Sequence, residues 1–466
     1  MAAIFCKERM RTIMTTDKNR QATISEQLAE HFRPIFYANL NQADIAVCKT
    51  LLLDYLGVAL CGSTTDSGRL AGSLVRGKGG NPEATLIGTT ASVPADDAAF
   101  ANAISSHSLE MDDVDQEALF HFGPPVVSAA LATAEAVAAS GEELITAVIC
   151  GCEMLERLSR AANPALRNRG FHTTAAAGVF GSAIASAKIL KLNEAQIVSA
   201  LGLAGAQASG LMEMYGSSMQ KRFNPGPAAT NGVKSARLAQ LGFTGAETIF
   251  EGERGFLNAF AGPSADQDAL RPQVRPYRLE VEFKAYACAR PIHPAVDAML
   301  ALRPRVQDRL AAITGIRISR HPMWAHYHLN SQPGSYHEAQ VSLPYAAAVA
   351  LMEGDAFLDQ FRRVDELLPK ITDLMGKITI EPVEGLPTTV ACRIEIALQD
   401  GEKLVYQVDH PKGSLQNPMT QEEREAKFAK LAGRVRNEGE LRELVRLVNQ
   451  LDKIADIRQF TKHLSF

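Results

Sequence analysis

The sequence is poor in aromatic residues. Only 6% of its 466 residues are aromatic and one is Trp, although 46% are hydrophobic. The core must therefore consist mostly of Ala, Leu, Val and Ile, and small side chains let helices approach one another closely. The charged fraction of 21% excludes a disordered chain. No uninterrupted apolar run reaches the roughly 18 residues of a transmembrane helix, so we expect no membrane contact.

An excess of positive charge is also lacking. The 48 Lys and Arg and the 52 Asp and Glu residues give a net charge of −4, with no long basic run. Proteins bind nucleic acid phosphates through clustered Lys and Arg, so we expect no nucleic acid partner. Residues 1–20 are basic but lack the apolar stretch of a secretory signal, and we expect them to form a loose tail.

The cysteine pattern excludes two further classes of protein. The seven cysteines are odd in number and scattered, and no CxxC pair occurs, so neither a zinc ribbon nor a disulfide framework is expected. Free thiols suit a reducing compartment, and we predict a cytoplasmic location. The motifs GxGxxG, GxxxxGK[ST], HExxH and GxSxG are absent as well. The sequence therefore has none of the usual motifs for nicotinamide binding, nucleoside triphosphate binding or serine-hydrolase catalysis.

Helical patterns dominate the first 260 residues. At roughly 100–200 residues per domain, the length predicts two or three domains. The later helices are rich in Ala, Gly and Ser, which indicates a tightly packed bundle. The expected helices are 42–60, 95–109, 125–140, 142–162, 172–192, 193–210 and 227–241.

The composition changes near Gly262, where Pro and Arg become denser. Alternating patterns then predict strands at 311–319, 377–382, 389–398 and 403–408, with helical segments between them. The turn at 399–401 joins the last two strands as a hairpin. This region is therefore α+β. Helices return after Pro411, where Thr420 and Glu423 form a capping-box pattern.

The densest acidic cluster follows the helix predicted to end near residue 109. Bunched carboxylates raise one another's pKa, and a nearby His exchanges protons near neutrality. The alternative is a solvated helix end. A calcium loop fits less well, because its sixth position is Ala118 and its twelfth is Pro124. The cluster consists of Glu110, Asp112, Asp113, Asp115 and Glu117, with His107 before it and His121 after it.

Two helix starts carry candidate anion-binding groups. His172 lies at the start of an Ala-rich helix, where free N–H groups suit a carboxylate, although simple N-capping by Thr173 or Thr174 is an alternative. Lys221 and Arg222 precede a Pro-Gly helix start. Such a pair holds an anion, and a desolvated Lys acts as a base at neutral pH, but a surface pair is the alternative.

A fourth cluster lies at a strand-to-helix junction. It brings together Lys284, Tyr286, Arg290 and His293, with Cys288 interpreted as a small buried thiol. The histidines at 321, 326, 328 and 337 have spacings that fit no compact ligand motif. Trp324 and Tyr327 among them indicate a packed loop, so we expect no metal.

Six stretches together resemble the MmgE/PrpD family. They occur in the family's order and span nearly the whole chain from about residue 22. The stretches are LLLDYLGVALCGS (51–63), HSLEMDDVD (107–115), GFHTTAAAGVFGSA (170–183), SMQKRFNPGPAATNG (218–232), KAYACARPIHPAVDA (284–298) and EAQVSLPYAAA (338–348).

The resemblance implies a mainly α fold. A large all-helical domain is made by both chain ends, 21–266 and 410–466, and a smaller α+β lid, 267–409, is inserted between them. It also implies a homodimer and an active site between the helical domain and the lid. That site takes a small anionic di- or tricarboxylate and uses no metal or organic cofactor.

The resemblance also implies which residues of this sequence form the site, one motif at a time. We predict that Lys221 and His121 form the acid/base pair, that His172 orients a carboxylate, and that Asp112 completes the catalytic group. The remaining motif positions are assigned to substrate binding. They are Glu110, Asp113, Arg222, Lys284, Tyr286, Arg290 and His293.

Two departures from the family pattern guide the choice of reaction. Val114 replaces the usual Thr or Tyr, which removes a hydroxyl, and His121-Phe122 stands where dehydratases tend to have His-Pro. Epimerisation needs no hydroxyl to expel, so we predict an isomerase, iminodisuccinate epimerase. The alternatives are the family's lyases, 2-methylcitrate dehydratase and cis-aconitate decarboxylase. A different class is an inactive helical interaction protein, in which the polar residues would point apart.

Overall fold

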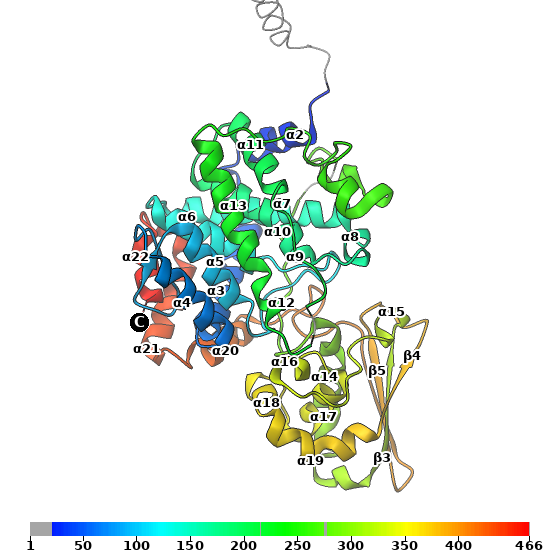
Figure 1. Ribbon diagram of the computed structural model, residues 1–466. Helices are drawn as coiled ribbons and strands as arrows, with labels where there is room; N and C mark the ends of the chain where they lie inside the picture. Colours follow the sequence, from blue (N-terminus) through cyan, green and yellow to red (C-terminus); the bar gives the residue numbers. More distant parts are fainter. Residues whose placement is uncertain (1–20, 215, 275–276, 466) are drawn as a thin grey trace, which may run out of the picture.

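A computed structural model describes residues 21–214, 216–274 and 277–465. The fold is mainly α, as predicted, with one two-stranded and one four-stranded sheet among the described residues. The tail predicted at residues 1–20 lies outside them. Figure 1 shows the helices of the first half of the chain gathered in one part and strands β3–β6 with their helices in another.

The first half of the chain forms helices with a strand pair between them. Several begin at a side-chain cap, such as the capping box of Ser140 and Glu143 at the start of α7. The predicted helix 172–192 is two helices, separated at Ala177. The elements are α2 (Ile24–Phe32), α3 (Gln42–Gly62), α4 (Asp66–Lys78), β1 (Ala84–Thr85), β2 (Ser92–Val93), α5 (Ala95–Ser106), α6 (Ser128–Ala136), α7 (Gly141–Ala162), α8 (Ala165–Asn168), α9 (Thr173–Ala176), α10 (Gly178–Ile189), α11 (Glu194–Gly205), α12 (Gln220–Phe223) and α13 (Pro225–Gln240).

The second group of elements lies around the four-stranded sheet. Its helices are α14 (His293–Leu302), α15 (Pro322–Ala325), α16 (Tyr336–Ala339), α17 (Leu343–Glu353), α18 (Leu358–Arg362) and α19 (Val364–Gly376). Its strands are β3 (Ile313–Arg320), β4 (Ile378–Pro382), β5 (Cys392–Leu398) and β6 (Lys403–Val408), in the order β4-β3-β5-β6. Strand β3 pairs parallel with β4 and antiparallel with β5.

The hairpin predicted around residues 399–401 is confirmed. Strands β5 and β6 pair antiparallel, and Gly401 has a φ of 87° in the turn between them. Along β5, Ile394, Ile396 and Leu398 are buried on one face, as the period of two predicts. These side chains and those of α14, α17 and α19 form one hydrophobic cluster.

The last helices return to the first half of the chain. They are α20 (Gln421–Ala432), α21 (Glu438–Asn449) and α22 (Arg458–Thr461), and Figure 1 shows them beside α3–α6. The predicted capping box of Thr420 and Glu423 starts α20. Lys427 Nζ of α20 donates to Asp54 Oδ1 of α3 at 2.5 Å and to the carbonyl of Met111 at 2.7 Å.

Helix α3 is the one described helix that is long and apolar enough, by length and composition, to cross a membrane. The sequence criterion of an uninterrupted apolar run did not identify this helix. Of its most apolar window, 72% is buried inside the protein, which is typical of a core helix. The six cysteines in the described part of the chain are free and buried, in agreement with the thiol prediction.

The predicted close packing centres on α10, which lies between α7 and α13. A Cβ on Gly232 of α13 would come within 2.3 Å of Ser182 Cβ and 2.7 Å of the backbone nitrogen of Ala183. A Cβ added to Gly151 or to Gly181 would likewise lie 2.7 Å from the carbonyl oxygen of the other residue. Real Cβ atoms do not approach so closely, so these helices pack at a distance that only glycine permits.

This contact predicts a stability difference between two glycines. Gly232→Ala should lower the free energy of unfolding by about 1–3 kcal/mol, because backbone atoms must move. Gly77→Ala in α4, where a Cβ meets nothing within 4 Å, should raise it by a few tenths to about 1 kcal/mol through helix propensity. Urea unfolding of both variants checks this, and equal effects would contradict the packing argument.

Candidate active site

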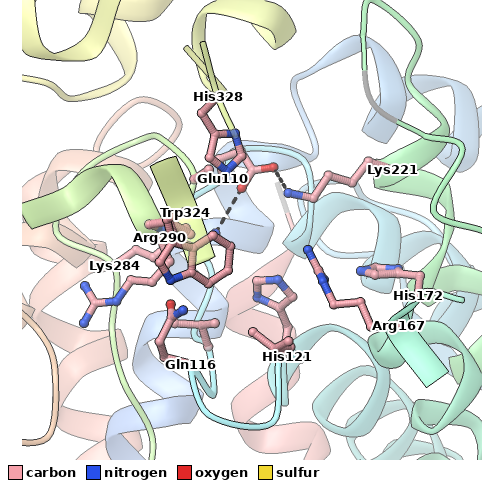
Figure 2. Close-up of a pocket in the computed structure, with 14 residues that line it drawn as sticks. Glu110, Gln116, His121, Arg167, His172, Lys221, Lys284, Arg290, Trp324 and His328 are labelled. Carbon is pink, nitrogen blue, oxygen red and sulfur yellow. Dashed lines mark hydrogen bonds and ion pairs between the residues drawn. The ribbon is translucent and has the colours of Figure 1, made fainter. Parts of the chain in front are cut away.

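A cavity of about 80 Å³ collects residues from both groups of elements. Figure 2 shows the side chains around it. Six of the predicted residues line it: Glu110, His121, His172, Lys221, Lys284 and Arg290. The polar residues therefore converge, which contradicts the expectation for an interaction protein in which they point apart.

Glu110 is the centre of the site. Its Oε1 accepts from Lys221 Nζ and, at 2.6 Å, from Arg222 Nη1, and its Oε2 accepts from Lys284 Nζ at 3.0 Å. Burial alone would raise the pKa of this carboxyl, but the three cations hold it well below the usual range. Glu110 is therefore a buried carboxylate that organises cations.

The two lysines respond differently to this centre. Burial lowers the pKa of Lys221 to about 8, and the neighbouring Lys284 and Arg222 oppose the attraction of Glu110. Burial also acts to lower the pKa of Lys284, but Glu110 and Asp112 outweigh it and the pKa is raised. Lys221 thus exchanges its proton near neutral pH, whereas Lys284 stays charged.

The backbone around the cavity is strained at three positions. Glu110, Leu119 and His328 have φ values of 55°, 62° and 65°, in the left-handed region that favours glycine. All three line the cavity, and each costs roughly 1–3 kcal/mol that the surrounding structure must supply. Such strain is concentrated where side-chain direction matters, which supports a functional interpretation of this cavity.

Asp112 lies behind the cavity and orients two histidines. Its Oδ2 is 2.7 Å from His107 Nδ1 and 3.0 Å from His121 Nδ1. Burial lowers the pKa of His107 to about 4, so this imidazole is neutral and donates from Nδ1. The contact of His121 Nδ1 with Asp112 leaves Nε2 as the nitrogen available for proton exchange in the cavity.

The same three side chains could share a metal ion, since their ligand atoms lie within 4.8 Å of one another. The atoms already pair with each other, because both Nδ1 groups contact Asp112 Oδ2. Hydrogen bonding thus accounts for the two Nδ1 atoms and Asp112 Oδ2 without an ion. The expectation that no metal binds remains a prediction.

Asp113 positions the loop that carries His121. Its carboxylate accepts from the backbone N–H groups of Phe122 at 2.5 Å and Gly123 at 2.9 Å, and its carbonyl lies 2.5 Å from His121 Nδ1. A Cβ on Gly123 would come within 2.6 Å of Asp113 Oδ1, so glycine is required there. Burial, together with Asp112, raises the pKa of Asp113 to about 7.

His172 precedes the short helix α9 and faces the cavity. Asn224 Nδ2 donates to His172 Nδ1 at 3.1 Å, so the ring proton sits on Nε2. Burial lowers the pKa of His172 well below its usual value, and the neutral ring is an N–H donor. N-capping by Thr173 or Thr174 is wrong, because Thr174 Oγ1 accepts from the His121 N–H and Thr173 Oγ1 pairs with Asn163.

Three of the predicted binding residues lie behind the cavity wall. Arg222 reaches Gln340 Oε1 at 3.0 Å on the far side of Glu110. The Tyr286 hydroxyl donates to Asp297 at 2.5 Å, and His293 Nε2 lies 3.2 Å from the Cys288 carbonyl. Their observed contacts hold the protein together around the site. Burial raises the pKa of the Cys288 thiol, in agreement with its interpretation as a buried thiol.

The sequence motifs did not identify four other polar or aromatic residues of the cavity, which are Gln116, Arg167, Trp324 and His328. Gln116 stands within the acidic block and Arg167 five residues before His172. Proximity to a motif was therefore the available signal for these two. Trp324 and His328 were interpreted as parts of a packed loop, and their place on the cavity depends on the fold.

Comparison with known proteins shows the family of the chain. The MmgE/PrpD N-terminal domain matches residues 26–268, and the MmgE/PrpD C-terminal domain matches residues 286–453. The chain belongs to the MmgE/PrpD family, as the motifs indicated.

Several curated relatives are cis-aconitate decarboxylases. The protein of that name from Homo sapiens is 27% identical over 455 residues, which is 94% of this chain and 94% of the relative. The one from Aspergillus terreus is 30% identical over 391 residues, or 77% of this chain and 79% of the relative. The one from Mus musculus is 26% identical and covers 95% of this chain and 93% of its own.

These relatives overturn the predicted reaction. The prediction of an isomerase, iminodisuccinate epimerase, is wrong, because relatives along almost the whole chain are named as carboxy-lyases. The alternative of a family lyase, cis-aconitate decarboxylase, agrees with them. The loss of a hydroxyl at Val114 was therefore a poor guide to the reaction.

The ion cluster predicts a large effect for one substitution. Glu110→Gln should lower the free energy of unfolding by about 3–5 kcal/mol, because three buried cations lose their shared anion. Glu366→Gln also removes a carboxylate that pairs with two cations, Arg363 and Lys370. It should change stability far less, because that cluster is exposed. Thermal unfolding compares the two, and a Glu110→Gln variant as stable as Glu366→Gln would contradict the central role of Glu110.

Proposed function

We propose that this protein is a carboxy-lyase that removes carbon dioxide from a small unsaturated tricarboxylate, cis-aconitate. The observation that carries the proposal is the combination of relatives and site. Cis-aconitate decarboxylases match along the chain, and the cavity joins a lysine of pKa about 8 to a second lysine, two arginines and three histidines.

The chemistry of the acid defines what the site must supply. Direct loss of carbon dioxide from a vinylic carbon would leave a localised carbanion. Loss of the allylic carboxylate instead lets the bonding electron pair form a new terminal double bond. The original double bond then shifts its pair to the carbon beside another carboxylate, and that carbon takes up one proton. The reaction needs cations near the remaining carboxylates and one proton donor.

Lys221 fits the role of proton donor. Its pKa of about 8 leaves most of it protonated at neutral pH yet able to transfer the proton, as general acid catalysis requires. Lys284 stays charged and offers a fixed cation. Neutral His172 offers its Nε2–H to a carboxylate, and His121 Nε2 is available for proton transfer or for orienting the substrate.

Apolar side chains complete the cavity. Val114, Leu119 and Trp324 line it together with the charged groups. A carboxylate moved from water into such surroundings loses solvation, whereas carbon dioxide is neutral and loses little. An apolar position for the departing carboxylate therefore favours decarboxylation. Val114 thus contributes to the reaction through its apolar surface.

The proposal includes the domain architecture. The larger hydrophobic cluster contains Phe32 from the first helix and Phe460 from the last, which supports a helical domain made by both chain ends. Leu270 and Phe283 belong to this cluster, so we place the start of the inserted α+β domain near residue 284 and its end near residue 409. The homodimer and the cytoplasmic location remain predictions.

Proton NMR in deuterium oxide tests the activity directly. Incubation of the protein with cis-aconitate should release carbon dioxide and give a product with new terminal methylene signals. One deuterium should appear on the carbon that was protonated. Absence of turnover with cis-aconitate, in a folded preparation, would overturn the proposal.

The pKa of Lys221 predicts a pH profile. The ammonium form donates the proton, so kcat should fall as the pH rises through about 8. Lys221→Arg keeps a cation beside Glu110 but holds its proton, so kcat should drop about 100-fold or more. Lys234→Arg in α13, which pairs with Asp96 on the surface, is the matched control and should retain activity. A Lys221→Arg enzyme with wild-type kcat would exclude Lys221 as the donor.

A further inference from the structure

The cations that line the cavity differ in whether the protein itself neutralises them. Lys221 and Lys284 pair with Glu110, and Arg290 Nη2 pairs with Glu282 Oε2 at 2.8 Å. Arg167 is the exception, since no carboxylate in the described part of the chain forms an ion pair with it. The cavity therefore contains one guanidinium whose charge is left for a ligand to balance.

The position of Arg167 is fixed by its short helix. Helix α8 follows Pro164, and its turn is closed by hydrogen bonds from the Asn168 N–H to the Pro164 carbonyl at 3.0 Å and from the Phe171 N–H to the Leu166 carbonyl at 3.2 Å. Leu166 is fully buried and anchors the turn. The side chain of Arg167 is half-buried rather than fully exposed to solvent.

The guanidinium is directed into the cavity. Figure 2 shows Arg167 rising beside His172 and His121, with its end toward Lys221. Its charge is one of the influences that, after burial, lower the pKa of His172. An anion held there would lie next to the neutral Nε2–H of His172 and close to the proton on Lys221.

We propose that Arg167 binds one carboxylate of the substrate and determines the preference of the site for tricarboxylates over dicarboxylates. This inference rests on the proposed function for the substrate class. The planar guanidinium holds a carboxylate with two parallel hydrogen bonds. Because Arg167 takes this carboxylate, Lys221 keeps its proton for the carbon.

Ligand binding tests the inference apart from turnover. Propane-1,2,3-tricarboxylate and glutarate share a carbon chain and differ by one carboxylate, and neither contains a double bond to react. Calorimetry should show that the wild-type protein prefers the tricarboxylate. Arg167→Gln should weaken tricarboxylate binding about 10- to 100-fold and remove most of the preference, because the third carboxylate has lost its cation. Arg167→Lys should restore part of the affinity.

The matched control is Arg169→Gln. Arg169 lies two residues away, is exposed and donates to the Ala259 carbonyl at 3.1 Å outside the cavity, so its loss should leave the ligand affinities unchanged. Arg167→Gln should also unfold at the wild-type temperature or above, because an uncompensated cation is removed. In turnover assays its KM should rise about 10-fold or more while kcat changes little.

The outcomes separate this inference from the proposed function. An Arg167→Gln protein that binds the tricarboxylate within twofold of wild type would overturn the role of Arg167, even if cis-aconitate is decarboxylated. Arg167-dependent tricarboxylate binding without turnover of cis-aconitate would support the binding role and reject the proposed reaction. Equal losses in Arg167→Gln and Arg169→Gln would also overturn it, since the effect would not come from the cavity.

Discussion

The buried ion cluster at Glu110 is the interaction on which the site depends. One carboxylate joins Lys221 and Arg222 of α12 to Lys284, which lies far away in sequence. Taking these charges out of water costs several kcal/mol per ion, and the cost is offset only when the geometry is good. The cluster therefore requires α12 and the segment around Lys284 to approach Glu110 together. Gln340 strengthens this arrangement by donating to the carbonyls of Leu109 and Ala287 at 2.8 and 2.9 Å.

The same cluster creates the chemical difference between the two lysines. Lys284 faces two carboxylates, Glu110 and Asp112, which hold its pKa above the usual value despite burial. Lys221 shares Glu110 with two other cations, so burial dominates and its pKa falls to about 8. Two identical side chains on one carboxylate thus become a permanent cation and a lysine that exchanges its proton near neutral pH. The difference comes from their neighbours rather than from their residue type.

Local patterns predicted the elements and many of the residues that line the cavity. Capping boxes, alternating strands and Gly-bounded helices are short-range signals. They correctly predicted the capping box of Thr420 and Glu423 and the turn between β5 and β6. The charged motifs predicted six residues of the cavity for a similar reason, since they occur in dense clusters. Trp324 and His328 carry no such signal, because only the fold brings them to the cavity. The break at Ala177 was missed because small and apolar residues continue on both sides of it and no Pro marks it in the sequence.

The sequence predicted the residues of the cavity better than it predicted the reaction. The reason is that the family's reactions have the same physical requirements. Epimerisation, dehydration and decarboxylation of small acids all require cations near carboxylates and a group that transfers a proton, so Lys221 and Glu110 do not distinguish them. The charge balance of the cavity is more informative. Arg167 has no ion-pair partner among the described residues, and in the proposed reaction the substrate loses one carboxylate while Lys221 gives up its proton. Substrate and product therefore differ in charge by one carboxylate, and a site tuned to three carboxylates holds the product less tightly. Binding and release then follow from the same electrostatic arrangement that positions the proton donor.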